Sequence, residues 1–388
     1  MMSAQKTAVD QAKSLAGKTD KLEDARALIK GAMQDPTTKE DAATYYVAGK
    51  IEFDAFDNGV KASMINPEDP AANPVAMGEA LLNGYRYFLQ ALPYDSVPDA
   101  KGKVKPKYSK DIVSKISGHS SDFFKAGAGL YEAKKYYPEA YDAFVIFAEL
   151  PDAPFLGDKA PKLADTDRGQ SYFNAGLAAY SGNEPLKSAD AFRAARKMGF
   201  EDLNAFIYEI ACWQAMAQND STMVETAKNK IYDIAKAGNE KFGIEQPIFL
   251  NNMVNSMVQD EKFADATAVI NEALATNPDN ADLYGLRGFV EDRAGNDDAS
   301  VADYLKSASM PGVGYETLKN AAKKVFKTGT LKFNSLDTAD RDGRMKVKAE
   351  YFDPAKKIVD QAKAMGQNDP DLDYVIDSLN YALETYFK

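Results

Sequence analysis

The sequence is poor in the residues that most often carry catalysis or bind metals. Its 388 residues include one cysteine, one histidine and one tryptophan. A single cysteine cannot form an intramolecular disulfide, so packing alone must hold the fold. The cysteine content therefore does not indicate whether the protein works in an oxidising or a reducing compartment. A single histidine excludes metal sites built from several imidazoles and leaves only His119 as an imidazole base.

Long apolar runs and an excess of positive charge are absent too. No run approaches the ~18 apolar residues that span a bilayer, so we expect no membrane insertion. The chain carries 47 Lys and Arg against 58 Asp and Glu, a net charge of −11. Such a surface repels phosphate backbones, so we expect no nucleic-acid partner. Hydrophobic residues make up 45% of the chain, which is enough to build a core.

The start of the chain bears on its compartment. It opens with Met1, Met2 and Ser3 and then enters a helical pattern without the apolar stretch of a signal peptide. A doubled methionine fits a new start placed where a leader was removed. We therefore favour an exported, periplasmic origin with the leader removed over a cytoplasmic one.

Apolar residues recur three and four positions apart along nearly the whole chain, which predicts helices rather than strands. Residues 328–352 are the exception, since they read partly as strand around a turn at Asp342 and Gly343. A small hairpin and a mobile loop fit that segment equally well. The predicted fold class is all-α.

A repeated pattern of a small residue, a large one four positions on and a small one three further marks the second helix of each predicted pair. It appears at Ala266, Ile270 and Ala273, and again from Ser300, which is 34 residues later (300 − 266 = 34). The unit from Ser300 continues with Tyr304 and Ser307, and further instances are Ala25/Ile29/Ala32, Gly84/Phe88/Ala91 and Ser188/Phe192/Ala195. A looser form of the pattern appears at Ala140/Phe144/Phe147, Ala227/Ile231/Ile234 and Ala355/Val359/Ala362. Small residues let two helices approach, so the pattern indicates helical hairpins that stack on one another.

The chain resembles the tetratricopeptide repeat (TPR) family, in degenerate form over nearly its whole length. One match to the family pattern runs from Tyr172 and Gly176 to Ser188, Phe192 and Ala195. A second match runs through Phe124, Ala128 and Tyr131 to Ala140 and Phe144. The resemblance implies a right-handed α-α superhelix, a TPR-like solenoid of about eight helical hairpins plus a C-terminal capping helix with a polar outer face.

The predicted organisation has four parts. Residues 1–150 hold N-terminal TPR-like repeats with long inter-helix loops, and 151–167 form a linker or loop. Regular repeats fill 168–314, and 315–388 form a divergent last repeat with an insertion at 328–353 and the capping helix. The residues in excess of a 34-residue repeat fall in 58–73, 93–108, 151–168 and 328–353; all but the last of these are rich in proline.

The resemblance also implies where a partner binds, because the first helix of each hairpin lines the concave groove in this family. The candidate peptide-binding residues on that face are Tyr46, Lys50, Lys125, Phe173, Tyr208, Asn251 and Asn255. Asn251 and Asn255 are four apart and share a helix face, and an amide offers the donor and acceptor that a peptide backbone needs. The carboxylate clamp of some family members is not carried over, because Asp282 and Leu286 stand where basic residues are needed.

Other features favour structural roles. We expect His119 in an exposed loop or at a helix cap, and Cys212 in the core or on the concave lining. Asp340 to Gly343 indicates a turn rather than a calcium loop, since Ala349 stands where that loop needs a glutamate. Five lysines between Lys101 and Lys110 indicate a solvated loop or a contact with an acidic partner. We expect no catalytic residue, metal or cofactor.

These observations favour a non-catalytic scaffold that binds a protein or peptide of unknown identity in its concave groove. The alternative is a structural or assembly protein that self-associates through its repeats. An enzyme would need clustered acids, such as Glu209 and Asp260, in a closed pocket.

Overall fold

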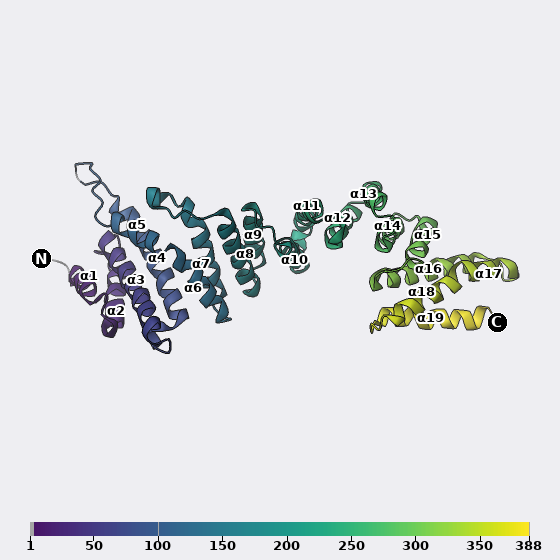
Figure 1. Ribbon diagram of the computed structural model, residues 1–388, viewed down its shortest axis with the longest axis horizontal. Coiled ribbons are helices and arrows are strands. Elements are labelled where there is room, and N and C mark those ends of the chain that lie inside the picture. Colours follow the sequence, from purple (N-terminus) through teal and green to yellow (C-terminus); the bar gives the residue numbers. More distant parts are fainter. Residues whose placement is uncertain (1–3, 100, 388) are drawn as a thin grey trace. The chain divides into compact units, whose positions relative to one another are not determined.

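The computed structural model describes residues 4–99 and 101–387, and every regular element in these ranges is helical (Figure 1). The predicted all-α class is thus confirmed. The chain divides into two compact units, Met1–Ala227 and Lys228–Lys388. Residues 1–3, on which the expectation of export rests, lie outside the described ranges. Within those ranges no helix is long and apolar enough to cross a membrane.

Unit 1 is a succession of helical hairpins, in which α1 pairs with α2, α3 with α4, α6 with α7 and α8 with α9. Its helices are α1 (Ala4–Leu15), α2 (Leu22–Gln34), α3 (Ala42–Ile65), α4 (Pro74–Asp95), α5 (Ser109–Gly118), α6 (Ser120–Glu132), α7 (Tyr137–Glu149), α8 (Asp165–Ser181), α9 (Pro185–Lys197) and α10 (Leu203–Asn219), followed by the start of α11 (Val224–Phe242).

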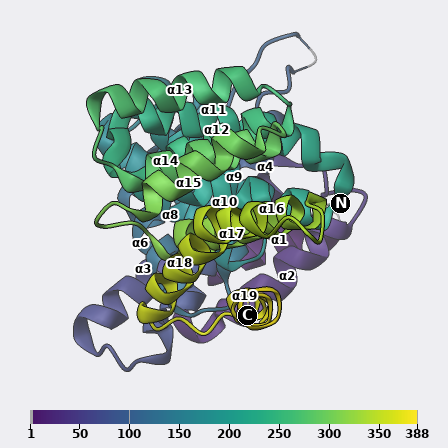
Figure 2. The same cartoon turned by 90° about the vertical axis from the view of Figure 1, so that its right-hand side faces the viewer.

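Unit 2 repeats the same construction with α12 beside α13, α14 beside α15 and α16 beside α18. Its helices are α12 (Pro247–Gln259), α13 (Phe263–Thr276), α14 (Ala281–Arg293), α15 (Asp297–Ala308), α16 (Tyr315–Ser335), α17 (Arg341–Val347), α18 (Asp353–Ala364) and α19 (Pro370–Tyr386). The hairpin of α14 and α15 is seen side by side in both Figure 1 and Figure 2.

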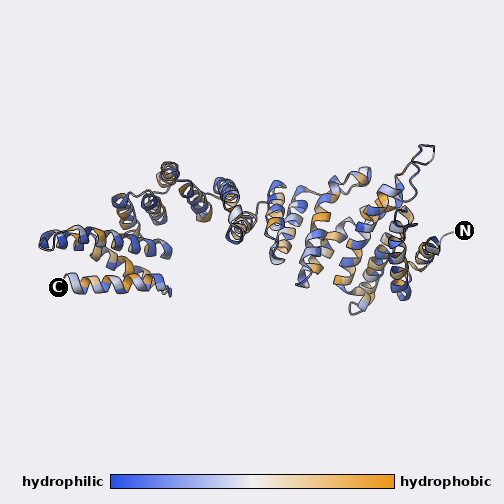
Figure 3. Ribbon diagram, turned by 180° about the vertical axis from the view of Figure 1, so that it is seen from behind, coloured by the Kyte–Doolittle hydropathy of each residue, from blue (hydrophilic) through white to orange (hydrophobic). Residues whose placement is uncertain are grey.

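Local sequence signals set many helix starts. Asn73 accepts the backbone N–H of Val75 at 2.9 Å with its side-chain oxygen, and Pro74 occupies the first turn of α4. Asp41, Asp202 and Asn280 cap α3, α10 and α14 in the same way. Most helices carry a hydrophobic and a hydrophilic side (Figure 3), so each must bury one face against its neighbours.

The predicted small–large–small pattern is the buried stripe of the second helices. Ser188, Phe192 and Ala195 of α9 are fully buried, and Ser300, Tyr304 and Ser307 of α15 are buried as well. The hydroxyls of Ser188 and Ser300 donate to the backbone carbonyls of Gly176 and Gly288, at 2.9 and 2.7 Å. The same hydrogen bond, from a serine to the carbonyl of a glycine, therefore joins the two helices of a hairpin in each unit.

The predicted register is wrong by one residue in α6. Phe123, Gly127 and Leu130 face the core, and the predicted Phe124 and Ala128 lie half-buried beside them. The physical reason is close approach, because a Cβ on Gly127 would lie 2.8 Å from the ring of Phe144. Only glycine lets α7 come so near.

Three of the four segments that hold the surplus residues are largely helical, whereas residues 96–99 and 101–108 form no helix. The hairpin or mobile loop expected at 328–352 is wrong, since α16 continues to Ser335 and α17 runs through a π-helix, Lys348–Phe352, into α18. Phe352 is buried there against Phe333. Residues 58–65 likewise extend α3, and the segment 151–167 lies inside unit 1, where Leu156 joins the core.

Helix α19 packs on α16 and α18 through Leu372, Val375 and Leu379. Its exposed face carries Asp377 and Glu384, as the predicted polar cap requires, and two tyrosines as well. Tyr374 and Tyr381 stand there with 75% and 62% of their surface exposed.

Candidate functional site

Two of the predicted binding residues, Asn251 and Asn255, lie in a groove of unit 2 between α12, α14 and α16, with a volume of about 520 Å³. We call this the amide groove. Residues that line it include Leu250, Asn251, Asn255, Asn280, Asp282, Leu286, Phe289, Glu316 and Asn320.

The walls of the amide groove are fixed by hydrogen bonds between helix starts. Asn280 caps α14 by accepting the N–H groups of Asp282 and Leu283. The carboxylate of Asp282 accepts the N–H of Gly314 at 3.1 Å and the hydroxyl of Thr317 at 2.8 Å. These bonds hold the start of α16 against the start of α14.

Three side-chain amides in this groove are uncommitted. Asn251, Asn255 and Asn320 are exposed, and none of them forms a hydrogen bond with another residue of the described ranges. Leu286 and Phe289 lie half-buried between them. The groove thus presents free donors and acceptors next to apolar surface, which is what an extended peptide needs.

The charges of the amide groove favour a neutral or basic ligand. Asp282 and Glu316 line it, and the described lining includes no lysine or arginine. Glu316 pairs with Lys319 at 2.8 Å, and Lys319 also reaches Asp369 at 2.9 Å. The hydrogen bonds to Glu316 and Asp369 raise the pKa of Lys319, so Lys319 stays charged at neutral pH.

Tyr46 and Lys50 lie one turn apart on α3 in unit 1, and both have intramolecular partners. The Tyr46 hydroxyl donates to Asp111 at 2.8 Å, and its ring stacks on Tyr108 with 4.4 Å between ring centroids. Burial, together with the bond to Asp111, raises the pKa of Tyr46. Lys50 pairs with Asp54 at 2.6 Å. Tyr46 thus helps to hold α5 against α3.

The other three predicted residues are also in unit 1. Lys125 is exposed and pairs with Asp122 at 3.1 Å. Phe173 and Tyr208 contact Phe192 from different helices, each with 5.5 Å between ring centroids. The structure gathers the candidates into these local groups, and their joint action on a partner stays a prediction.

His119 lies at the junction of α5 and α6, a cap position as expected, but it is mostly buried rather than exposed. Its ring contacts Phe53, and its Nδ1 lies 3.0 Å from a carboxylate oxygen of Asp122. Its Nε2 lies 3.4 Å from Asp57. The bond from His119 lowers the pKa of Asp122. The ring therefore bridges two acidic side chains of the scaffold.

Cys212 is fully buried, so its predicted place in the core is confirmed. Its thiol donates to the hydroxyl of Ser188 at 3.3 Å. Burial raises the pKa of the Cys212 thiol, which keeps it protonated and unreactive at neutral pH.

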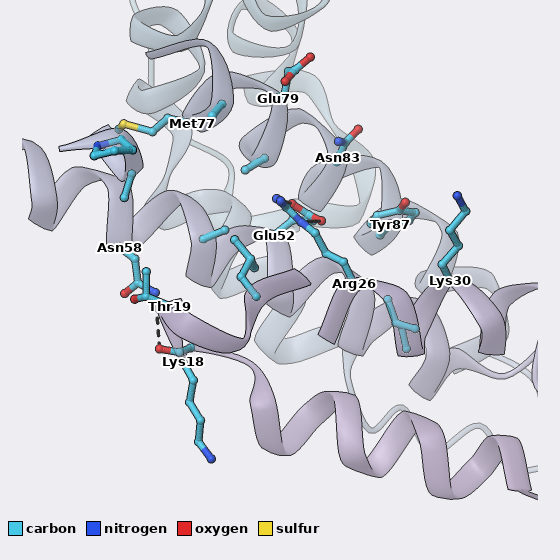
Figure 4. Close-up of a pocket in the computed structure, with 18 of the residues that line it drawn as sticks. Lys18, Thr19, Arg26, Lys30, Glu52, Asn58, Met77, Glu79, Asn83 and Tyr87 are labelled. Atoms are coloured by element: carbon cyan, nitrogen blue, oxygen red, sulfur yellow. Dashed lines mark hydrogen bonds and ion pairs between the residues drawn. The ribbon is translucent and has the colours of Figure 1, made fainter. Parts of the chain in front are cut away.

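Sequence reasoning missed a second groove, in unit 1, with a volume of about 700 Å³ (Figure 4). We call it the α2–α4 groove. Residues that shape it are Lys18, Leu22, Arg26, Ile29, Lys30, Met33, Glu52, Ala55, Asn58, Ala76, Met77, Glu79, Ala80, Asn83 and Tyr87. It was missed because it lies along second helices, whereas the family pattern points to first helices.

An ion pair occupies the middle of the α2–α4 groove. Arg26 donates to both carboxylate oxygens of Glu52, at 2.8 and 2.5 Å, and Figure 4 shows the two side chains pointing toward each other. Glu52 is 7% exposed, so its charge depends on this partner. The hydrogen bond to Glu52 outweighs burial and raises the pKa of Arg26.

The hairpins make this chain an all-α helical-repeat protein. No protein-family model matches it, and no curated protein sequence does. Among solved structures it is similar to the TPR domain of P58(IPK), with 13% identity, 99% of each chain covered and a TM-score of 0.30. It is also similar to yeast Tom70, with 14% identity, 97% of this chain and 95% of that one covered and a TM-score of 0.26.

Proposed function

We propose that this chain is a non-catalytic scaffold that binds proteins or peptides, and that the amide groove is one of its binding sites. The observation that carries the proposal is the trio of free amides, Asn251, Asn255 and Asn320, around half-buried Leu286 and Phe289. This combination matches the backbone and side chains of a peptide at the same time.

Recognition uses an extended segment of the partner. The amides of Asn251 and Asn255 pair with its main-chain N–H and C=O groups, and an apolar side chain lies on Phe289. Because Asp282 and Glu316 flank the site, the segment is neutral or basic. The groove is preformed by the bonds of Asp282, so little ordering is needed on the scaffold side.

The geometry of the candidate catalytic groups supports a non-catalytic role. Glu209 is held by Arg196 at 2.6 Å in unit 1, and Asp260 pairs with Lys262 at 2.8 Å in unit 2. The two acids proposed for an enzyme are thus neutralised by separate structural partners. His119 and Cys212 are engaged within the scaffold as well.

Photo-crosslinking in the full chain tests the amide groove. A benzoylphenylalanine in place of Asn320 should capture the partner, and the same group at Asn334 is a matched control. Asn334 is also exposed on α16 but lies about 21 Å further along the helix.

Replacing both Asn251 and Asn255 by alanine should weaken capture from position 320 by roughly thirtyfold, because each lost amide contributes about 1 kcal/mol. Equal capture from positions 320 and 334, or capture unchanged by the double variant, would contradict the groove assignment.

Self-association is the second candidate function. The exposed Tyr374 and Tyr381 on α19 favour it, because large aromatic side chains are enriched where proteins meet.

A further inference from the structure

The α2–α4 groove is open where the equivalent gap one hairpin later is closed. Helices α4 and α7 pack on each other directly, and Arg86 pairs with Asp142 across them at 2.6 Å. Helices α2 and α4 both pack on α3 but, in the described part of the chain, scarcely touch each other. A gap bounded by three helices therefore remains.

The size of this gap suits one more helix. Its α2 wall runs from Leu22 to Met33 and its α4 wall from Ala76 to Tyr87. Each wall has twelve residues and spans about 16 Å. That length is about three helical turns. The lining residues recur three or four apart on both walls, so each wall is a row of ridges against which another helix can pack.

The floor and one end of the groove are defined. Ala55 of α3 and Ala80 of α4 are small, which gives the groove its depth. At one end Asn58 donates to the carbonyl of Gly17 at 3.5 Å, which ties the start of the α2 wall to α3. Met33 and Met77 lie toward opposite ends and offer apolar surface that adapts to a ligand.

The groove is positive in a protein that is strongly negative. Lys18, Arg26 and Lys30 face Glu52 and Glu79, a net charge of +1 against −11 for the whole chain. Arg26 and Glu52 neutralise each other. Lys18 and Lys30, both on the α2 side, form no ion pair with any described residue, so they are available to a carboxylate of a ligand.

We propose that the α2–α4 groove binds one amphipathic helix of a partner protein, of about three turns, with acidic residues on the flank that faces α2. Its apolar stripe covers Met33 and Met77. Its carboxylates pair with Lys18 and Lys30. This site is independent of the amide groove, which lies in the other unit and favours the opposite ligand charge.

Methyl NMR of the full chain with labelled methionines tests the proposal. The probe is a side-chain-stapled amphipathic helix with a leucine stripe and glutamates on its flanks. It should shift the methyl signals of Met33 and Met77 and leave those of the exposed Met64 and Met365 unchanged.

Two control peptides separate the parts of the claim. The same helix with lysine flanks should bind roughly tenfold more weakly, because two rim ion pairs are replaced by repulsion. A version that keeps the leucines and glutamates but has two prolines in place of the staple should not bind, because it cannot form the helix. Equal binding of the lysine peptide overturns the charge preference, and equal binding of the proline peptide overturns the helical ligand.

Variants locate the site. The double change Lys18→Glu and Lys30→Glu should reverse the peptide preference, whereas Lys39→Glu, exposed and outside the groove, should not. Ala55→Phe should fill the floor and abolish the shifts. Since Ala55→Phe also perturbs packing, the thermal unfolding of this variant is measured alongside. If the Ala55→Phe variant fails to fold, the lysine variants alone test the location of the site. An absence of shifts at Met33 and Met77 with the glutamate peptide overturns the proposal.

Discussion

At the residue scale, one contact recurs through both units: a glycine on one helix receives an aromatic ring from its partner. A Cβ on Gly176 would lie 2.6 Å from the ring of Phe192, and one on Gly238 would lie 2.5 Å from the ring of Phe249. Real Cβ atoms do not approach a ring so closely, so glycine is required where these helices meet. The rings fill the space that a side chain would otherwise occupy.

Gly176→Ala should therefore destabilise the protein by about 1–3 kcal/mol, the usual cost of overpacking a core. Phe192 has no room to yield, because it is fully buried between Phe173 and Tyr208. Urea unfolding at neutral pH measures the change. Gly118→Ala is the control, because nothing lies within 4 Å of its Cβ position, and the two variants should differ clearly. Equal stabilities would mean that the close approach is relaxed in solution.

At the element scale, the helices and their buried faces could be predicted where the spacing of apolar residues within one helix determines which residues are buried. Ala25, Ile29 and Ala32 of α2 are buried as expected, because three- and four-residue spacing is a local property. The path of 328–353 depends instead on tertiary contacts, since Phe352 becomes buried only when a π-helical turn brings it to Phe333. Asn251 and Asn255 could be predicted to share a helix face, because their spacing of four residues is a local property. The α2–α4 groove could not be predicted, because it depends on a gap between helices.

Lys324 illustrates how a single side chain joins three elements. Its ammonium group, on α16, contacts Asp292 of α14 and Asp297 at the start of α15, and the residue is 7% exposed. Burial alone would lower the pKa of Lys324, but the bonds to the two carboxylates raise it. The bond from Lys324 likewise lowers the pKa of Asp297.

Lys324→Met should therefore destabilise the protein by about 1–2 kcal/mol at neutral pH, less than for a fully buried pair because both carboxylates reach solvent. The raised pKa of Lys324 means that its contribution is lost as pH rises beyond 10.5, and the lowered pKa of Asp297 means that it is lost as pH falls below 3.8. The difference from the natural protein should shrink in both directions, as followed by chemical denaturation across pH. Lys323→Met, an exposed neighbour, should change stability little.

At the scale of the whole molecule, the two units offer ligands opposite kinds of surface. Unit 1 holds the lysine-rimmed α2–α4 groove, and unit 2 holds the amide groove with its carboxylates. The two proposed sites would let one chain hold an acidic helix and a neutral or basic extended segment. Its large net negative charge opposes association with another copy of itself.

Self-association through α19 should therefore depend on salt. Tyr374 and Tyr381 are seven residues apart on one face, flanked by Asp377 and Glu384, and the helix carries no basic residue. Two such helices repel at low ionic strength, and salt shortens the reach of that repulsion to about 8 Å at 0.15 M. Sedimentation velocity should show a monomer at low salt and a larger species as salt rises. Replacing both tyrosines by serine should keep the chain monomeric, whereas Met365→Ser, also exposed, should not. A mass that ignores both salt and the tyrosine changes would leave α19 with a capping role alone.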